Sequence, residues 1–117
     1  LETQVERLIC LGIAREKIII DPGVGFGKTE AHNLTLLARL SLFHSLGCPI
    51  LIGASRKKFI GTIGKASLAK DRMPGSLAVA LEAVAQGAQI VRVHDVAETR
   101  QALDVWQAVT TGDYNGA

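Results

Sequence analysis

Three short clusters of polar residues follow strand-like apolar runs in this chain of 117 residues, and their residue types could bind an anionic ligand. Asp21 ends the first run and precedes a glycine-rich turn at 22–27. A Ser-Arg-Lys-Lys stretch at 55–58 follows the second run, and Arg92 and His94 end the third. In parallel α/β folds the functional groups collect beyond the carboxyl ends of the strands. We therefore expect one carboxylate and several cations to share a single rim of the molecule.

Asp21 has two interpretations. A carboxylate at the end of an isoleucine-rich strand is costly to bury unless it is hydrogen-bonded. It could accept backbone N–H groups of the glycine-rich turn and act as a loop cap. It could instead accept paired N–H donors from a flat ligand, such as a 2-amino-4-oxo heterocycle, because a two-point contact of this kind gives geometric specificity.

The glycine-rich turn fits neither of the two common nucleotide-binding motifs. A P-loop would need glycine where Pro22 stands, and a G-x-G-x-x-G fingerprint from Gly23 would need glycine where Lys28 stands. The glycines, Gly25 among them, instead allow the backbone to approach a flat ligand closely. Phe26 has few local packing partners between glycines, which favours a lid against that ligand over a plug in the core.

Positive charge concentrates in the segment 53–72, where six lysines and arginines face one aspartate, a net charge of +5 against −3 for the rest of the chain. A solvated basic loop would explain several of these cations, but Lys57 lies just past Gly53, where the second strand is expected to end. Alternation along the third strand puts Arg92 and His94 on one face. That face fits a polar barrel mouth better than an open sheet, with a solvated edge strand as the alternative. A basic rim suits a small molecule that carries a di- or triphosphate.

Other polar residues carry weaker signals. We expect His32 and His44 to be structural or solvated, and Ser76 and Thr99 to be ordinary helix residues. No pair of histidines has the spacing of metal ligands, and no group resembles a nucleophile with its base.

Composition indicates a globular protein of a reducing compartment. The chain is 48% hydrophobic and 21% charged, and its net charge of +2 does not indicate a nucleic-acid partner. No stretch has the length of a membrane span, and no secretory signal is visible. Cys10 and Cys48 lie far apart, so we expect no disulfide framework or cysteine zinc site, and a cytoplasmic location.

Apolar periodicity predicts alternating helices and strands without linkers or repeats. Three strands are too few for a parallel sheet to be covered on both faces, so we expect part of a larger α/β fold, either an open doubly wound sheet or a (β/α)8 barrel. The predicted domain covers 1–109, and a flexible tail follows at 110–117. Helices are predicted at 2–11, 33–46, 76–86 and 96–109, strands at 17–21 (buried on both faces), 50–52 and 89–93, and a long polar segment at 54–74.

Four motifs occur together in the order typical of one family. They are Asp21-Pro-Gly-Val-Gly-Phe-Gly-Lys28, Gly53-Ala-Ser-Arg-Lys-Lys58, Gly75-Ser-Leu-Ala78 and Val91-Arg-Val-His-Asp-Val96. With this order and spacing, residues 17–96 resemble the carboxy-terminal part of bacterial dihydropteroate synthase. The resemblance implies the C-terminal three βα units of a (β/α)8 TIM barrel, in which the strands of this chain are the sixth, seventh and eighth. The chain would then be a fragment, an incomplete barrel of the pterin-binding type.

The resemblance also implies an activity and residue roles. The family joins p-aminobenzoate to 6-hydroxymethyl-7,8-dihydropterin diphosphate in folate biosynthesis, and it is the target of sulfonamides. By motif position, Asp21 would bind the pterin ring, and Lys57 would contact the pterin and order the p-aminobenzoate site. Gly25, Phe26 and Ser55 would lie at the p-aminobenzoate site, and Arg92 and His94 would hold the diphosphate. The implied catalytic residues are Lys57, Arg92 and His94. The whole implied substrate-binding set is Asp21, Gly25, Phe26, Gly53, Ser55, Lys57, Arg92 and His94.

Other features of the family would lie outside this chain. Among them are the first five strands and the asparagine that binds magnesium. The resemblance therefore implies a Mg²⁺ cofactor in the parent enzyme but no metal ligand here. It also implies small-molecule substrates and a homodimeric parent. The charge and hydropathy given above lead us to expect no nucleic-acid or membrane partner. We expect the 117-residue piece alone to be inactive and poorly stable.

Two other functions stay open. One is a pterin-binding methyltransferase barrel that passes a methyl group from methyltetrahydrofolate to a corrinoid protein. It would share the pterin carboxylate but would have no diphosphate to bind, so the Ser55–Lys57 stretch and the Arg92/His94 pair argue against it. The other is a non-catalytic, truncated module that packs against a partner carrying the first five strands.

Overall fold

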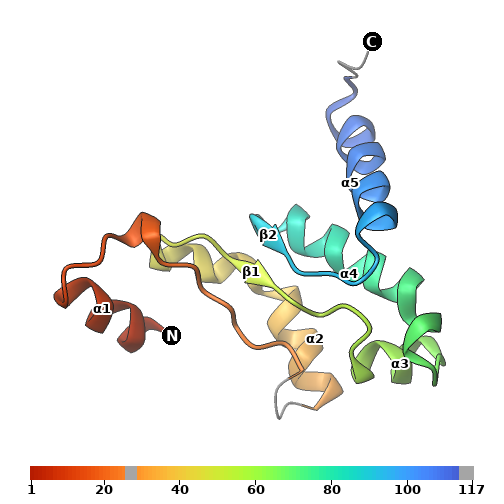
Figure 1. Cartoon of the computed structure of the whole chain (residues 1–117), viewed down its shortest axis with the longest axis horizontal. Helices are drawn as coiled ribbons and strands as arrows, with labels where there is room; N and C mark the ends of the chain where they lie inside the picture. The colour runs from red at the N-terminus through yellow and green to blue at the C-terminus, as the bar shows by residue number, and fades with distance from the viewer. Residues whose placement is uncertain (26–28, 114–117) are drawn as a thin grey trace.

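The computed structural model describes residues 1–25 and 29–113, and this part of the chain is an α/β arrangement of helices around short parallel strands (Figure 1). The elements, in chain order, are α1 (Glu2–Cys10), the 3-10 helix η1 (Arg15–Lys17), α2 (Glu30–Ala38), the 3-10 helix η2 (Leu40–Leu46), β1 (Leu51–Ile52), α3 (Lys58–Gly64), the 3-10 helix η3 (Ala69–Arg72), α4 (Met73–Ala85), β2 (Ile90–Val91) and α5 (Val96–Thr111).

Three extended segments run side by side in the same direction. Strand β1 pairs with β2 in parallel, with Ile52 opposite Val91. On the other side of β1, a parallel bridge joins Ile20 to Ile50, and the Leu51 amide donates to the Ile20 carbonyl at 2.8 Å. The predicted parallel direction is therefore confirmed, although the segment around Ile20 forms a single bridge rather than a strand.

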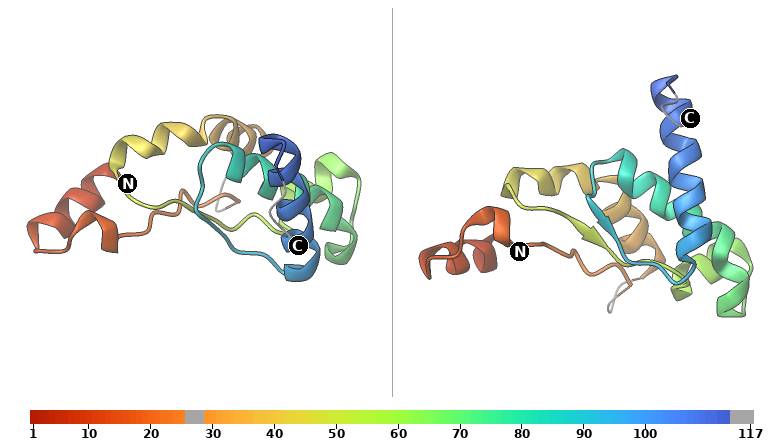
Figure 2. Two further views of the ribbon diagram at one scale, coloured as in Figure 1. Left: turned by 90° about the horizontal axis from the view of Figure 1, so that it is seen from above. Right: turned by 45° about the horizontal axis from the view of Figure 1, so that its top comes forward.

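The two faces of these segments differ in burial. Helices α2 and α4 lie on one side (Figure 2), and we call this side the covered face: Ile18, Ile20, Ile50 and Ile52 are each 6% exposed or less. The other side is the open face, and Ile19 on it is 55% exposed. The prediction that 17–21 is a strand buried on both faces is therefore wrong. Lys17 lies in η1, and within the described residues helices cover only one side of this segment.

The hydrophobic core lies between the covered face and the helices. Leu40 and Ile50 are completely buried, and Val24 and Ala83 are 1% exposed. Burial of each large aliphatic side chain contributes about 1.5–3 kcal/mol relative to its exposure to water. This layer fixes where the carboxyl ends of the extended segments emerge.

The second helix differs from its prediction at 33–46. Thr29 is the N-cap of α2, because its Oγ1 accepts the His32 amide at 3.2 Å. Asn33, at the predicted start of this helix, is instead buried within it at 2% exposure. The helix then gives way to η2 after Arg39, and Gly47 ends η2 in the left-handed region at φ +69°, directly after the predicted helix end at 46.

The predicted polar segment at 54–74 contains helical structure. Phe59 and Ile60 of α3 are buried at 4% and 5% exposure, which gives the short helix an apolar side. Helix α4 begins at Met73 rather than at Ser76, with Pro74 in the first turn, where its missing N–H costs nothing. Helices α1 and α5 were predicted to within two residues.

The chain is less compact than its length suggests. Its radius of gyration is 15.6 Å, with extents of 43 × 42 × 21 Å, whereas a compact domain of this size would have a radius of about 13 Å. Helices α1 and α5 extend from different sides of the molecule (Figure 1), and Val105 and Val109 of α5 are exposed. No helix among the described residues has the length and apolar character needed to cross a lipid bilayer.

Candidate active site

The polar clusters meet where the extended segments end, beyond β1 and β2. A pocket of about 130 Å³ lies there, and it is lined from the loop after β1 by Gly53, Ser55 and Lys57 and from the loop after β2 by Arg92, Val93 and His94. Two of the three predicted clusters therefore share one cavity, as the parallel direction of the strands requires.

Lys57 connects this pocket to the remaining cluster, which is the glycine-rich turn after Asp21. Its Nζ donates a hydrogen bond to the Val24 carbonyl oxygen. Its aliphatic stem lies across Gly25, so that a Cβ at position 25 would be only 2.7 Å from the Lys57 Cδ. Gly25 also has φ +87°, a conformation that side chains disfavour. Glycine is thus required at position 25 on two independent grounds.

Asp21 acts as a cap of the glycine-rich turn. Its Oδ1 accepts the Gly23 amide at 2.8 Å, and the side chain is half-buried. The loop-cap interpretation is therefore confirmed for one carboxylate oxygen. Binding of a heterocycle by Asp21 remains a prediction.

Asn33 is a site-supporting residue that the sequence analysis missed. Its Oδ1 accepts the Gly25 amide at 2.8 Å, so a buried side chain of α2 holds the backbone of the turn. The signal was present, because Asn33 lies four and seven residues before Leu37 and Leu40 on the apolar side of the helix. A polar residue in that stripe needs a buried partner. Phe26, the predicted lid, lies outside the described residues.

Arg92 lies against Gly53 on the open face. A Cβ at position 53 would come within 2.6 Å of the Arg92 Nη2, so glycine leaves the room in which the guanidinium lies. Arg92 and His94 are exposed, and they alternate with the half-buried Val91 and Val93. The predicted alternation along this segment is confirmed.

Ser55 and His94 contact each other across the pocket. The His94 amide donates to the Ser55 Oγ at 3.2 Å, and the His94 Nδ1 lies 3.0 Å from the same oxygen. This double contact orients the imidazole ring from its Nδ1 side. It leaves Nε2 as the ring atom through which His94 could meet a ligand.

Arg56 makes an ion pair that the sequence analysis did not predict. Its Nη2 and Nε donate to the two carboxylate oxygens of Asp95 at 2.7 Å and 3.2 Å. This hydrogen bonding lowers the pKa of Asp95 and raises the pKa of Arg56. Arg56 is thus directed to a neighbouring loop, although the sequence groups it with the cations of the rim.

Ser76 and Arg72 hold the backbone of Arg56. The Ser76 Oγ accepts the Arg56 amide at 2.8 Å, and the Arg72 Nη1 donates to the Arg56 carbonyl at 3.0 Å. Ser76 is 7% exposed and donates in turn to the Arg72 carbonyl at 2.9 Å. Ser76 lies in helix α4, as predicted, but its support of the Arg56 backbone was not predicted. The solvated-loop interpretation fits the exposed Lys58, Lys65 and Lys70 instead.

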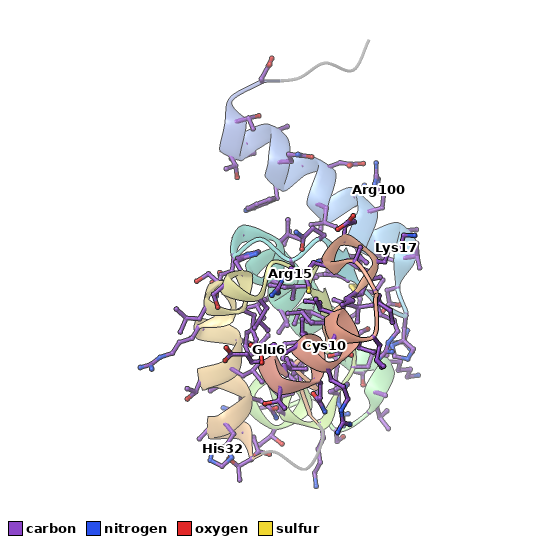
Figure 3. All side chains as sticks on the ribbon, turned by 90° about the vertical axis from the view of Figure 1, so that its left-hand side faces the viewer. Glu6, Cys10, Arg15, Lys17, His32 and Arg100 are labelled. Atoms are coloured by element: carbon purple, nitrogen blue, oxygen red, sulfur yellow. The ribbon has the colours of Figure 1, made fainter. Side chains whose placement is uncertain are left out.

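The other histidines lie away from the pocket. The His44 Nε2 is 2.8 Å from the Gln86 carbonyl oxygen, so His44 has the predicted structural role. His32 is exposed near the start of α2 (Figure 3). Within residues 1–25 and 29–113, no three His, Cys, Asp or Glu side chains come together as they would around a metal ion.

The match to a known family agrees with this geometry. The family model described as "Pterin binding enzyme" matches residues 1–94. This chain therefore belongs to the pterin-binding enzyme family.

Within that family, the chain is similar to proteins named dihydropteroate synthase, as the sequence motifs indicated. The enzyme of Escherichia coli strain K12 is 47% identical over 112 residues, which cover 96% of this chain and 39% of that protein. The enzyme of Neisseria meningitidis serogroup C is 48% identical over 110 residues, covering 93% of this chain and 39% of that protein. The chain thus spans about two fifths of the length of these relatives.

Solved structures of the same kind share the fold. Dihydropteroate synthase of Yersinia pestis superposes with a TM-score of 0.88 at 44% identity, over 94% of this chain and 51% of that chain. The Thermus thermophilus enzyme in complex with 4-aminobenzoate gives 0.88 at 44% identity, over 94% of this chain and 44% of that chain. The resemblance inferred from the four motifs is confirmed.

Proposed function

We propose that this chain is part of a dihydropteroate synthase, and that residues 1–109 form three consecutive βα units of its (β/α)8 barrel, with 110–117 as a tail. The observation that carries the proposal is the shared pocket, in which Lys57, Arg92 and His94 come together from two loops. The parallel order of the extended segments and the similarity to solved dihydropteroate synthases support the barrel.

The proposed reaction displaces diphosphate from a pterin. The lone pair of the p-aminobenzoate amine attacks the methylene carbon of 6-hydroxymethyl-7,8-dihydropterin diphosphate and forms a C–N bond. The C–O bond breaks, diphosphate leaves with the electron pair, and the amine nitrogen loses a proton. Negative charge therefore grows on the leaving oxygen, and cationic donors fixed in advance stabilise it. No covalent nucleophile is needed.

The proposed residue roles follow the geometry of the rim. Arg92 and His94 would hold the diphosphate, since both belong to the pocket lining. Lys57 would bridge the two substrates, because it contacts both this pocket and the glycine-rich turn. Asp21 would bind the pterin ring next to that turn. Ser55, Gly25 and Phe26 are the residues we assign to the p-aminobenzoate site, with Gly53 making room for Arg92.

A magnesium ion is implied by the family, but the described residues do not fit a metal site by themselves. They hold no group of three side chains that could bind an ion. No step of the reaction is therefore assigned to a metal bound by this chain. Its own contribution is the fixed positive charge around the pocket.

For the complete protein we also propose a cytoplasmic homodimer. The exposed Cys10 and the buried Cys48 are both free thiols, which suits a reducing compartment. Light scattering coupled to size-exclusion chromatography of the complete protein would give twice the monomer mass if the dimer is correct.

The test of the function is an enzyme assay of the complete protein. By this we mean the chain joined to the segments that carry the other strands of the proposed barrel. We expect dihydropteroate and diphosphate from the pterin diphosphate and p-aminobenzoate, and none from the 117-residue chain alone. Methyl transfer from methyltetrahydrofolate without dihydropteroate formation would support the methyltransferase instead. A stable, inactive complex of the 117-residue chain with a separate chain that carries the other strands, seen by size-exclusion chromatography with light scattering, would support the non-catalytic module.

A further inference from the structure

Arg56 has a backbone conformation that its residue type disfavours. Its φ is +57°, in the left-handed region where a Cβ is crowded, and Lys65 is the other non-glycine residue of the described chain with this property. Residues are held in such conformations only when their surroundings fix them. The contacts that fix Arg56 therefore show what this part of the loop must maintain.

Those contacts come from three other segments. Asp95, after β2, binds the guanidinium through both carboxylate oxygens, at 2.7 Å and 3.2 Å. Ser76 of α4 accepts the Arg56 amide, and Arg72 of η3 donates to its carbonyl. The backbone of Arg56 is thus held on the amide and carbonyl sides, and its side chain is directed to the loop after β2.

The side chain of Asp95 pairs with Arg56 and does not cap helix α5. It stands at the N-cap position of α5, where an aspartate side chain normally accepts an amide of the first turn, but here it makes no such hydrogen bond. The Asp95 carbonyl accepts the Thr99 amide and hydroxyl, and the carboxylate is committed to Arg56. The ion pair therefore replaces a helix cap with a link between two loops.

The link joins the two loops that line the candidate site. Arg56 lies between Ser55 and Lys57, and Asp95 directly follows His94. We propose that Arg56 and Asp95 are positioning residues, whose ion pair holds these two loops in the arrangement that stabilises the departing diphosphate. This inference rests on the proposed function.

A role in stability alone would be a weaker account. The side chains of Arg56 and Asp95 are 29% and 18% exposed, so water competes with the ion pair and limits what it adds to folding. An aspartate carboxylate is ionised at neutral pH, and its two hydrogen bonds from Arg56, at 2.7 Å and 3.2 Å, are the geometry that the positioning role requires.

The experiment compares variants of the complete protein in steady-state synthesis of dihydropteroate, with kcat expressed per folded molecule and with a thermal melt for each variant. Asp95→Asn keeps the size of the side chain and removes its charge. Arg56→Lys keeps the positive charge and removes the bidentate hydrogen bonding to Asp95. The matched control is Arg100→Ala, which breaks another Arg–Asp ion pair, with Asp104 at 3.3 Å, on the exposed surface of α5 (Figure 3).

We expect Asp95→Asn to lower kcat about 10- to 100-fold, the effect of slightly misplaced catalytic groups, while KM for the pterin diphosphate changes much less. The single variant Arg56→Lys, which keeps a charge that can pair with Asp95, should lose less kcat than Asp95→Asn or Arg56→Ala. Combining Asp95→Asn with Arg56→Ala should cost no more than the worse single variant, because the two residues act as one unit. Arg100→Ala should leave kcat and KM unchanged.

Two results would overturn the inference, and they are distinguishable. If the unaltered complete protein forms no dihydropteroate, the proposed function fails and the positioning role falls with it. If that protein is active but Asp95→Asn behaves like Arg100→Ala, only the positioning role is wrong. Should Arg56→Ala fail to fold, Asp95→Asn and Arg56→Lys decide the question.

Discussion

The covered and open faces of the extended segments have opposite characters. On the covered face, Ile20, Ile50 and Ile52 are buried under helices, and their apolar contacts hold the fold together. On the open face, Arg92 and His94 alternate with apolar residues and are accessible. The difference teaches that the same group of parallel segments can direct apolar side chains to the core on one face and cationic side chains to a pocket on the other. Substitutions on the covered face should therefore change the unfolding free energy, and substitutions on the open face should change kcat.

The largest effect is expected on the open face. Arg92→Ala in the complete protein should lower kcat for dihydropteroate synthesis about 10²- to 10³-fold, or about 3–4 kcal/mol, because a fixed cationic donor for the leaving group is lost. The melting temperature should stay close to that of the unaltered protein, since Arg92 contributes no side chain to the hydrophobic core. Steady-state kinetics and a thermal melt check both points. Unchanged kinetics would remove Arg92 from the site.

Gly53→Ala should lower activity through Arg92 rather than through the fold. The new Cβ would come within 2.6 Å of the Arg92 Nη2, and the end of a flexible side chain can move aside. We expect a loss of about 10- to 100-fold in kcat from the displaced guanidinium. In the Arg92→Ala background the same change should have little further effect. A full additional loss there would show that Gly53 acts independently of Arg92.

Ile50→Val tests the covered face. Ile50 is completely buried, and removing one methylene from such a site costs about 0.5–1.5 kcal/mol of unfolding free energy. Urea unfolding should report this loss, while kcat per folded molecule stays the same. A change in kcat without a change in stability would contradict the division between the faces.

The Arg56–Asp95 pair should stabilise the fold only above acidic pH. The ion pair lowers the folded-state pKa of Asp95 below its ordinary value of 3.8. Its contribution is therefore complete above about pH 5 and is lost as the pH falls through the lowered pKa. Urea unfolding at several pH values should show a smaller acid-induced loss of stability in Asp95→Asn. If the unfolding free energy of the unaltered protein and of Asp95→Asn depends on pH in the same way, this prediction is contradicted.

The smallest effect is expected at Ile19, an apolar residue of the open face. It is 55% exposed, so Ile19→Thr in this 117-residue chain should change the unfolding free energy by less than about 0.5 kcal/mol. Urea unfolding of the two chains provides the comparison. A larger loss would show that the side chain is covered in solution.

The rim could be predicted from sequence because it depends on a simple periodicity. β-Branched runs mark the extended segments, and parallel strands bring the residues that follow them to one edge. The placement of Lys57, Arg92 and His94 at one pocket follows from these two facts alone. Strand ends also depend on neighbours, so the single bridge at Ile20 could not be read from its isoleucines.

The supporting residues were harder to predict, because their contacts are local exceptions. Asn33 near a helix start has the composition of a cap, but Thr29 takes that role and leaves Asn33 to bind the turn. Nothing in the sequence marks Arg56 for a left-handed φ. The seven residues of α3 are too few to show a clear helical repeat of apolar residues. The buried Phe59 was therefore predicted to lie in the polar segment at 54–74.

The parallel order of the extended segments has a consequence for handling this chain. Among the described residues, the segment at 18–20 pairs only with residues 49–51, at the start of β1, and strand β2 pairs on the other side of β1. The outer backbone groups of both segments therefore offer a template to which further strands can add. In a complete barrel the same chain's own strands would occupy these edges. Produced by itself, the chain would recruit copies of itself there, so dilute solutions and early checks for aggregation would be needed in any refolding work.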